Sequence, residues 1–221
     1  MIRAICFDFD GTLTRFTGDF GKLLNEGFAK LGLASSLRET VLAEYKQQLR
    51  KEDAVTSHSA LIKTLESLSL RVGADLKEIN TAFVRAYREQ MELLPGAQEV
   101  LELCRDHVPL ALITNGPEDM QRAAVEEVDI AHFFQTILIS GAREVAVRKP
   151  SAQIFQLACE RLDVLPEEVL MVGDNLEADI RGALGAGMKA VQLSSEPTSL
   201  QAAPRVADLF QLEAHLRDLL T

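Results

Sequence analysis

Hydrophobic residues recur along the 221-residue chain with two different periods, and the change of period divides the chain into two parts. Between about residues 16 and 92, apolar positions return every three or four residues in four stretches, as on one face of an amphipathic helix. No strand-like alternation interrupts them, so the pattern predicts an all-helical unit over 16–92, a small four-helix bundle. Asp19 and Asp75 stand where helix N-caps are expected. The four apolar stripes are Phe20, Leu23, Leu24, Phe28 and Leu31; Val41, Leu42, Tyr45 and Leu49; Leu61, Ile62, Leu65 and Leu68; and Leu76, Ile79, Phe83 and Tyr87.

The rest of the chain alternates short, continuous apolar runs with helical patterns. Apolar runs separated by helices are typical of a parallel sheet that is covered on both faces. We therefore expect an α/β fold, a Rossmann-like doubly wound parallel sheet formed by residues 1–15 and 93–221. Ligands meet the carboxyl ends of such strands, so the helical unit, inserted after the first strand, would lie over the site as a cap. The runs are 2–7, 109–113, 136–139, 169–172 and 189–193, and the helical patterns are 97–106, 118–128, 151–162 and 177–185.

Polar residues follow these apolar runs at the predicted carboxyl edge of the sheet. Asp8 and Asp10 follow the first run, Thr114 and Asn115 the second, and Asp174 the fourth. A buried strand has no structural need of carboxylates at its tip, because isolated ionised carboxylates are costly to remove from water. Two that lie close together also raise one another's pKa unless a cation intervenes. The pattern indicates a site that holds a metal or performs carboxylate chemistry.

Asp174 and Asp179 are five residues apart, a spacing that would separate them by about 140° on one continuous helix. Both can face one point only if Asp174 lies in the loop after its strand and Asp179 lies in the first turn of a helix that begins near Glu177. Alternatively, Asp179 simply complements the positive N-terminus of that helix. Converging carboxylates repel by about 4 kcal/mol per pair at about 4 Å, even at an effective dielectric constant of about 20. A divalent cation with oxygen ligands removes this repulsion, and Mg²⁺ is the usual one beside a phosphate.

Several groups at the same edge are suited to a phosphoryl group. Lys149 supplies a point charge, while the Thr114 hydroxyl and the Asn115 side chain supply hydrogen bonds. The backbone amides of Gly11 and Thr12 are expected to add donors of the kind that phosphate needs.

Composition narrows the possible partners. A formal net charge of −10 and the lack of Lys/Arg runs argue against nucleic-acid binding, which needs a basic surface. The first apolar residues are interrupted by Arg3, Asp8 and Asp10, so they predict neither a signal peptide nor a membrane span, and cytoplasmic residence is expected. The three widely spaced cysteines predict buried, reduced thiols, with a catalytic thiol as the alternative; they are Cys6, Cys104 and Cys159.

Four motifs stand in order at the predicted strand ends: DFDGTLT at 8–14, ITN at 113–115, RKP at 148–150 and GDNLEAD at 173–179. Through these motifs the chain resembles the haloacid dehalogenase-like hydrolase superfamily, in the branch that carries a helical cap after the first strand. It resembles the subgroup that contains phosphoglycolate phosphatases, nucleotidases and N-acylneuraminate-9-phosphatase, and the resemblance covers essentially the whole chain.

The resemblance implies a role for each motif residue. Asp8 corresponds to the nucleophile that forms an aspartyl-phosphate, and Asp10 to the general acid that protonates the leaving oxygen and later activates water. Thr114 and Lys149 correspond to the clamp on the phosphate and the nucleophile. The implied magnesium site comprises Asp8, the Asp10 main-chain carbonyl and Asp174, with Asp179 in support.

The demands of the reaction agree with this division of roles. Hydrolysis of phosphate monoesters needs accelerations of up to ~10²¹, of which general acid–base catalysis supplies about 10²–10⁴. A metal, a covalent relay and a positioned clamp must therefore act together.

Four other functions are alternatives to a phosphatase. A dehalogenase on this fold needs no proton for its leaving halide, and the acid at Asp10 argues against it. A phosphomutase stays open, because residues around the phosphate cannot separate it from a phosphatase. A phospho-accepting receiver would carry its acceptor on a middle strand, but Ser140 and Gly141 follow the run 136–139. An intact set of catalytic groups disfavours a non-catalytic binding module.

Substrate choice is expected to come from the cap and from the loop at 14–21. Arg15, Thr17 and Lys22 are candidates for contacts with the leaving group, and weaker candidates are Arg50, Lys51 and His58. For each of them a solvated surface residue is the more ordinary interpretation. A sugar phosphate, phosphoglycolate or a nucleoside monophosphate would fit a compact site of this kind. The expected partner is thus a small phosphorylated metabolite, with the enzyme a monomer or homodimer.

Overall fold

Among the residues that the structure describes, the main sheet has six parallel strands. The computed structural model describes residues 1–51, 56–195 and 203–220. Within them the strands lie in the order β5-β4-β1-β6-β7-β8, and every pair is parallel. This arrangement confirms the predicted α/β class. The strands are β1 (Ala4–Phe7), β4 (Leu110–Thr114), β5 (Thr136–Ile139), β6 (Val169–Gly173), β7 (Lys189–Leu193) and β8 (Arg205–Val206).

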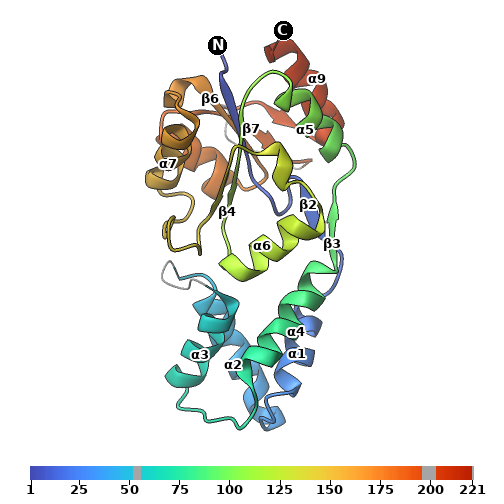
Figure 1. Ribbon diagram of the computed structural model, residues 1–221, viewed down its shortest axis with the longest axis vertical. Coiled ribbons are helices and arrows are strands. Elements are labelled where there is room, and N and C mark those ends of the chain that lie inside the picture. The colour runs from blue at the N-terminus through green and yellow to red at the C-terminus, as the bar shows by residue number, and fades with distance from the viewer. Residues whose placement is uncertain (52–55, 196–202, 221) are drawn as a thin grey trace.

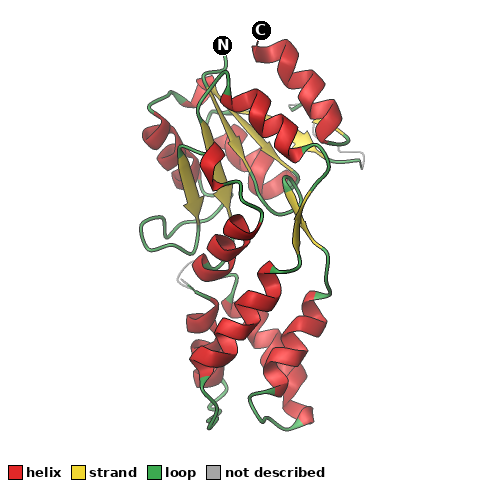
Figure 2. Cartoon of the chain, turned by 45° about the vertical axis from the view of Figure 1, so that its right-hand side comes forward, coloured by secondary structure: helices red, strands yellow, loops and turns green. Residues whose placement is uncertain are grey.

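Helices cover both faces of the sheet, which explains why its strands read as continuous apolar runs (Figures 1 and 2). One face is packed by α5 (Ala97–Arg105), α6 (Glu118–Glu127) and α9 (Leu209–Leu220). The other is packed by α7 (Ala152–Leu162) and α8 (Gly182–Gly185). All four residues of β1 are fully buried between these layers.

The order of the strands places the tip of β1 at a topological switch point. From β1 the chain moves to β4 and outward to β5, and it then returns to β6 on the other side of β1. Connections that leave a strand in opposite directions open a crevice at its carboxyl end. Asp8 follows β1 immediately, so it lies in that crevice.

Four helices form a unit of their own below the sheet in Figure 1, and they match the four predicted stripes. They are α1 (Phe20–Ala29), α2 (Ser35–Gln48), α3 (Ser57–Ser67) and α4 (Leu76–Arg88). As predicted, Asp19 and Asp75 cap α1 and α4; Asp19 accepts one hydrogen bond from a backbone amide of the first turn, and Asp75 accepts two. Phe28, Tyr45 and Phe83 meet edge to face in the middle of the unit, with centroids 5.2 and 6.3 Å apart.

A short antiparallel ribbon joins the helical unit to the sheet, and this element was not predicted. It pairs β2 (Thr14–Phe16) with β3 (Met91–Leu93). Strands of three residues are too short to show a period in sequence. The expectation of an all-helical stretch over 16–92 is therefore wrong at its two ends, where Phe16 lies opposite Met91.

Two features after residue 174 also differ from the prediction. The helix expected over 177–185 is a wide π turn, η3 (Leu176–Arg181), followed by the single turn of α8. The prediction ended at Leu193 and missed β8 and α9, although Leu209, Leu212 and Leu216 form a buried helical stripe.

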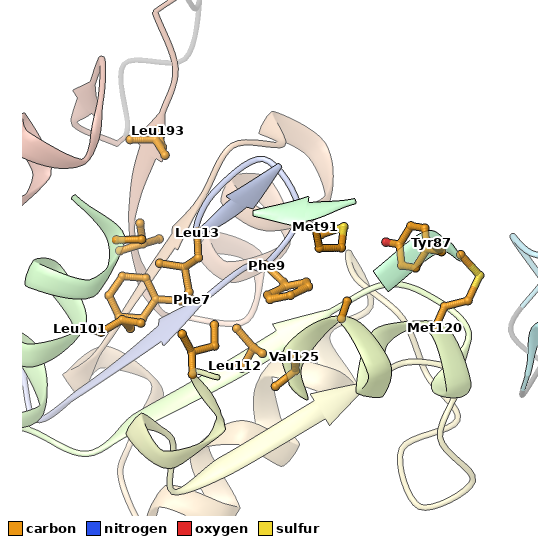
Figure 3. Close-up of a cluster of buried hydrophobic side chains, with 14 of the residues drawn as sticks. Phe7, Phe9, Leu13, Tyr87, Met91, Leu101, Leu112, Met120, Val125 and Leu193 are labelled. Carbon is orange, nitrogen blue, oxygen red and sulfur yellow. The ribbon is translucent and has the colours of Figure 1, made fainter. Parts of the chain in front are cut away.

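A continuous cluster of buried side chains links the sheet to the base of the helical unit (Figure 3). It runs from Phe7 of β1 through Phe9 and Met91 to Tyr87 of α4 and Met120 of α6. Helix α6 lies between the two parts and contacts α3 and α4. Among the described residues, no helix is both long enough and apolar enough to cross a bilayer.

Candidate active site

Lys149 is the centre of a buried charge network at the tip of β1. Its Nζ atom lies 2.5 Å from Oδ1 of Asp8 and 2.7 Å from Oδ1 of Asp179, and it donates a hydrogen bond to the Ile113 carbonyl at 2.7 Å. Burial alone would lower the pKa of Lys149, but the two carboxylates outweigh this effect and raise it. Lys149 therefore carries its charge inside the protein.

The backbone of Lys149 is held by a residue from the neighbouring strand end. The side chain of Asn115 accepts a hydrogen bond from the Lys149 amide and donates one to the Lys149 carbonyl, both at 2.9 Å. Two reciprocal bonds fix the loop after β5 to the end of β4. Asn115 thus positions the lysine, a role more specific than the one predicted for it.

Three carboxylates converge beside Lys149. Oxygen atoms of Asp8, Asp174 and Asp179 lie within 4.8 Å of one another. As predicted, Asp174 lies in the loop after β6, and Asp179 lies in the first turn that follows. The Asp10 carboxylate is not a member of this cluster.

Asn175 shapes the turn that brings Asp179 inward. Its side-chain oxygen accepts hydrogen bonds from the amides of Glu177 and Ala178, and its own amide donates to Asp179 Oδ2 at 2.9 Å. Both oxygens of Asp179 are therefore engaged, one by this amide and the other by Lys149. Asp179 is thus held by its own contacts and supports the carboxylate cluster.

Two glycines allow the carboxylates to approach the backbone. A Cβ atom on Gly11, whose φ is +86°, would lie 2.6 Å from Oδ2 of Asp174. A Cβ atom on Gly173 would lie 2.4 Å from the Cβ of Asp179. A side chain at either position would displace a carboxylate, so the glycines are needed for close packing of the site.

The electrostatics of the cluster fit a divalent cation. Burial, followed by the charge of Asp8, raises the pKa of Asp174 and of Asp179 to about 6. Hard oxygen donors that repel one another in this way are the ligand set that Mg²⁺ takes in proteins. The residues present therefore fit a metal held by Asp8 and Asp174, with Asp179 in support.

Asp10 is outside this cluster and is held by a different network. Its Oδ2 accepts a hydrogen bond from Nε2 of Gln121 at 3.0 Å, and Oε1 of Gln121 accepts one from the Thr114 hydroxyl at 2.9 Å. Burial, and then the charge of Asp8, raises the pKa of Asp10 to about 6. The two aspartates of the first motif are thus in different environments, one paired with a cation and the other with an amide.

A pocket of about 180 Å³ opens between these groups. Its volume is below the range of drug-sized ligand sites, which suits a phosphoryl group and a small remainder. The pocket is lined by Asp8, Asp10, Thr114, Asn115, Lys149, Asp174, Asn175, Ala178 and Asp179.

Some predicted substrate contacts lie elsewhere. Arg15 does not line this pocket; it is 58% exposed on β2 and pairs with Glu92 of β3 at 3.2 Å. Thr17 donates its hydroxyl hydrogen to the Gln90 carbonyl, 3.0 Å away. Arg15 belongs to the ribbon that the sequence prediction missed, and Thr17 follows its first strand directly.

The predicted donation from the Gly11 and Thr12 amides to a phosphate does not fit the structure. These amides donate within their own loop, to the carbonyls of Thr14 and Phe9 at 2.8 and 3.3 Å. Instead, the Thr12 hydroxyl donates to Asp8 Oδ2 at 3.3 Å. The amide of Phe9 donates no hydrogen bond within the described ranges, so it stays available at the strand end.

Gln121 and Asn175 are the site residues that sequence reasoning missed. Asn175 lies inside the fourth motif, where an N-cap signal before Glu177 was readable. Gln121 lies on α6, in the second turn after the ITN motif, and nothing in its neighbours marks it as functional. Only the packing of α6 against the strand ends brings it to Asp10.

Comparison with known proteins gives the class of this enzyme. Residues 2–187 match the haloacid dehalogenase-like hydrolase family, and the chain belongs to it. Its relatives include a ribulose-1,5-bisphosphate 5-phosphatase from Halopiger xanaduensis, 31% identical over 94% of this chain and 92% of that one. An N-acylneuraminate-9-phosphatase from Rattus norvegicus is 30% identical over 86% and 81%. The enzyme is a hydrolase of phosphoric monoester bonds.

One further relative and one solved structure agree with this family. A phosphoserine phosphatase from Thermus thermophilus is 41% identical over 60% of this chain, and the match spans 54% of that enzyme's length. A haloacid dehalogenase-like phosphatase from Thermococcus onnurineus superimposes with a TM-score of 0.76 at 26% identity, over 97% of this chain and 98% of the other. The predicted family resemblance is confirmed.

Proposed function

We propose that this protein is a Mg²⁺-dependent phosphatase that hydrolyses a small organic phosphomonoester through an aspartyl-phosphate on Asp8. The observation that carries the proposal is the contrast between its two first-motif aspartates. Asp8 is paired with a buried lysine and stands in a carboxylate cluster, whereas Asp10 has a pKa raised to about 6 and accepts its hydrogen bond from a neutral amide. One is suited to attack and the other to transfer a proton.

In the first step, a carboxylate oxygen of Asp8 forms a bond to phosphorus while the ester P–O bond breaks. The departing oxygen takes the proton of Asp10, so the alcohol leaves neutral. In the second step, Asp10 takes a proton from water as the water oxygen attacks phosphorus. The acyl-phosphate P–O bond then breaks, which restores the Asp8 carboxylate and releases inorganic phosphate.

The remaining groups bind and orient the phosphoryl oxygens. Lys149 presents an ammonium charge, and its ion pair with Asp179 keeps that charge beside Asp8. Thr114 also lines the pocket from the end of β4, with its single hydroxyl hydrogen donated to Gln121. The Phe9 amide offers a further donor at the tip of β1. Such fixed donors stabilise charge without reorganisation.

Mg²⁺, when bound, supplies positive charge that offsets the repulsion between nucleophile and phosphate. The residues proposed to hold it are Asp8, Asp174 and the main-chain carbonyl of Asp10, with Asp179 in support. The clustering of three carboxylates supports this assignment.

The domain organisation belongs to the same proposal. We divide the chain into a core of residues 1–15 and 93–221 and a helical cap of residues 16–92 that covers the pocket and selects the leaving group. The three cysteines are free and buried, which suits a reducing cytoplasm and disfavours a catalytic thiol. A monomer or a homodimer is expected, with a small phosphorylated metabolite as the partner.

A phosphate-release screen tests the proposal. Sugar phosphates, nucleoside monophosphates and carboxylic-acid phosphates are offered with Mg²⁺ and, in parallel, with excess EDTA. We expect release of inorganic phosphate from at least one ester, lost in EDTA. A phosphoryl group recovered on a second hydroxyl of the same sugar would instead show a mutase, and full activity in EDTA would exclude the metal.

A further inference from the structure

We infer that Gln121 is a positioning residue that sets which oxygen of Asp10 carries the catalytic proton and aims that oxygen at the leaving group. The inference rests on the proposed function, because it assigns Gln121 a task within that reaction. It concerns a residue outside the four motifs, on a helix that packs against the strand ends.

Gln121 makes two directional hydrogen bonds that together fix its amide plane. Nε2 donates to Asp10 Oδ2 at 3.0 Å, and Oε1 accepts from the Thr114 hydroxyl at 2.9 Å. Turning the amide by 180° would place a donor against the hydroxyl hydrogen and an acceptor against the carboxylate. Gln121 is 3% exposed, so water does not compete for these partners.

The surroundings leave Gln121 little room to move. A Cβ atom on Gly116 would lie 2.8 Å from both Cγ and Nε2 of Gln121, which shows how closely the backbone after β4 approaches the amide. Helix α4, which carries Tyr87, packs against α6. Tyr87 and Met120, the residue before Gln121, are neighbours in the buried cluster of Figure 3. The amide of Gln121 therefore lies in a closely packed, buried part of the site.

This geometry assigns different roles to the two oxygens of Asp10. A donor aimed at Oδ2 competes with protonation of that atom, so the proton is placed on Oδ1. Within the described residues no group donates to Oδ1, and Asp10 lines the pocket. Without Gln121, either oxygen could carry the proton and the carboxyl group could rotate. Fewer molecules would then present the proton to the leaving oxygen.

The test compares two substrates that differ in how much they need that proton. Phenyl phosphate releases a strongly basic phenolate, whereas p-nitrophenyl phosphate has nearly the same shape and releases an anion stable in water. For Gln121→Met, which keeps the length of the side chain, we expect kcat/KM to fall about 10–100-fold on phenyl phosphate and less than about 3-fold on p-nitrophenyl phosphate. Glu126→Ala, an exposed change on the same helix, should leave both values unaltered.

A second variant distinguishes loss of the hydrogen bond to Asp10 from a folding defect. Gln121→Glu keeps an acceptor for Thr114 but cannot donate to Asp10 as an anion, so it should show the same substrate-dependent loss while its circular dichroism stays that of the wild type. Equal losses on the two esters, or no loss, in a folded variant would overturn the inference and leave the phosphatase proposal intact. A wild-type enzyme that releases phosphate from neither of these esters nor from any ester of the phosphate-release screen would overturn the proposed function itself.

Discussion

The Nζ atom of Lys149 lies 2.5 Å from Oδ1 of Asp8, and both side chains are more than nine-tenths buried. A buried pair of this kind adds little net stability over an apolar pair, but removing one partner leaves an uncompensated charge. In this protein the lysine faces a second carboxylate as well, that of Asp179. Loss of Lys149 would therefore leave two buried carboxylates without a cation.

We predict that Lys149→Met lowers the free energy of unfolding of the metal-free protein by about 3–5 kcal/mol, because Asp8 and Asp179 lose their cation. Phosphatase activity should fall by at least about 10²-fold, since the phosphate loses its ammonium partner. Urea titration and phosphate release measure the two effects. Lys189→Met changes an exposed lysine on β7 and serves as the matched control. It should change the free energy of unfolding by no more than about 0.5 kcal/mol, and the phosphatase activity by no more than the factor that corresponds to this energy.

A comparison of two glycines with positive φ distinguishes the effect of backbone strain from damage to the carboxylate cluster. Gly11→Ala and Gly32→Ala both place an L residue at positive φ, +86° and +70°, so each should cost about 1 kcal/mol of stability. Only at Gly11 does the new Cβ meet Asp174 Oδ2; at Gly32 nothing lies within 4 Å. We expect Gly11→Ala alone to raise the Mg²⁺ concentration for half-maximal activity, by about 10–100-fold. Equal Mg²⁺ titrations for the two variants would contradict the close approach.

The raised pKa values of three carboxyl groups predict an unusual dependence of stability on pH in the absence of metal. Asp10, Asp174 and Asp179 have a pKa of about 6 when folded, above the ordinary value for aspartate. As pH rises from about 4 to 6, the unfolded chain releases these protons first, so the folded state loses stability across that window and the full penalty holds above it.

Mg²⁺ should reverse this penalty. The midpoint of thermal unfolding is measured at about pH 5 and about pH 7.5, with EDTA and with saturating Mg²⁺. We expect Mg²⁺ to raise the midpoint more at the higher pH, where all three carboxyl groups are ionised. Asp174→Asn should abolish most of the Mg²⁺ effect, and an Mg²⁺ shift of the same size at both pH values would count against the carboxylate cluster as the binding site.

Asp119 connects the sheet layer to the helical unit. It lies on α6, and its carboxylate accepts hydrogen bonds from the amide and hydroxyl of Ser57 at 2.7 and 2.6 Å and from the Asn80 side chain at 3.1 Å. We predict that Asp119→Ala lowers the free energy of unfolding by about 1–3 kcal/mol, because buried donors lose a charged acceptor. A double-mutant cycle with Ser57→Ala should give a coupling of at least about 0.5 kcal/mol; additive effects would show that the contact does not hold the two parts together.

The edge of the sheet that carries the site was readable from the chain because buried parallel strands have two unmistakable features: they are continuously apolar, and they end abruptly. Asp8, Thr114 and Asp174 each follow such an end, so the topology brings them together. The helix after Asp174 was harder to predict, since the π turn depends on Asn175 and on the space left by Gly173.

Other features depend on contacts that sequence periodicity does not encode. The pairing of Arg15 with Glu92 joins residues 77 positions apart on strands too short to show alternation. Gln121 has the burial of an ordinary helix residue, and its role follows only from the way α6 packs on Asp10 and Thr114. Long-range packing of this kind decides which polar residue serves the site.

The central claim is that Asp8 forms a covalent bond to phosphorus. It is tested by quenching the enzyme in acid during turnover of a substrate found in the phosphate-release screen, reducing it with borohydride, and sequencing the peptides by mass spectrometry. An acyl phosphate is reduced to an alcohol, so the account predicts homoserine at position 8 in samples that received substrate, and unmodified Asp8 without it. Turnover with an unmodified Asp8, or with the label on another residue, would contradict it.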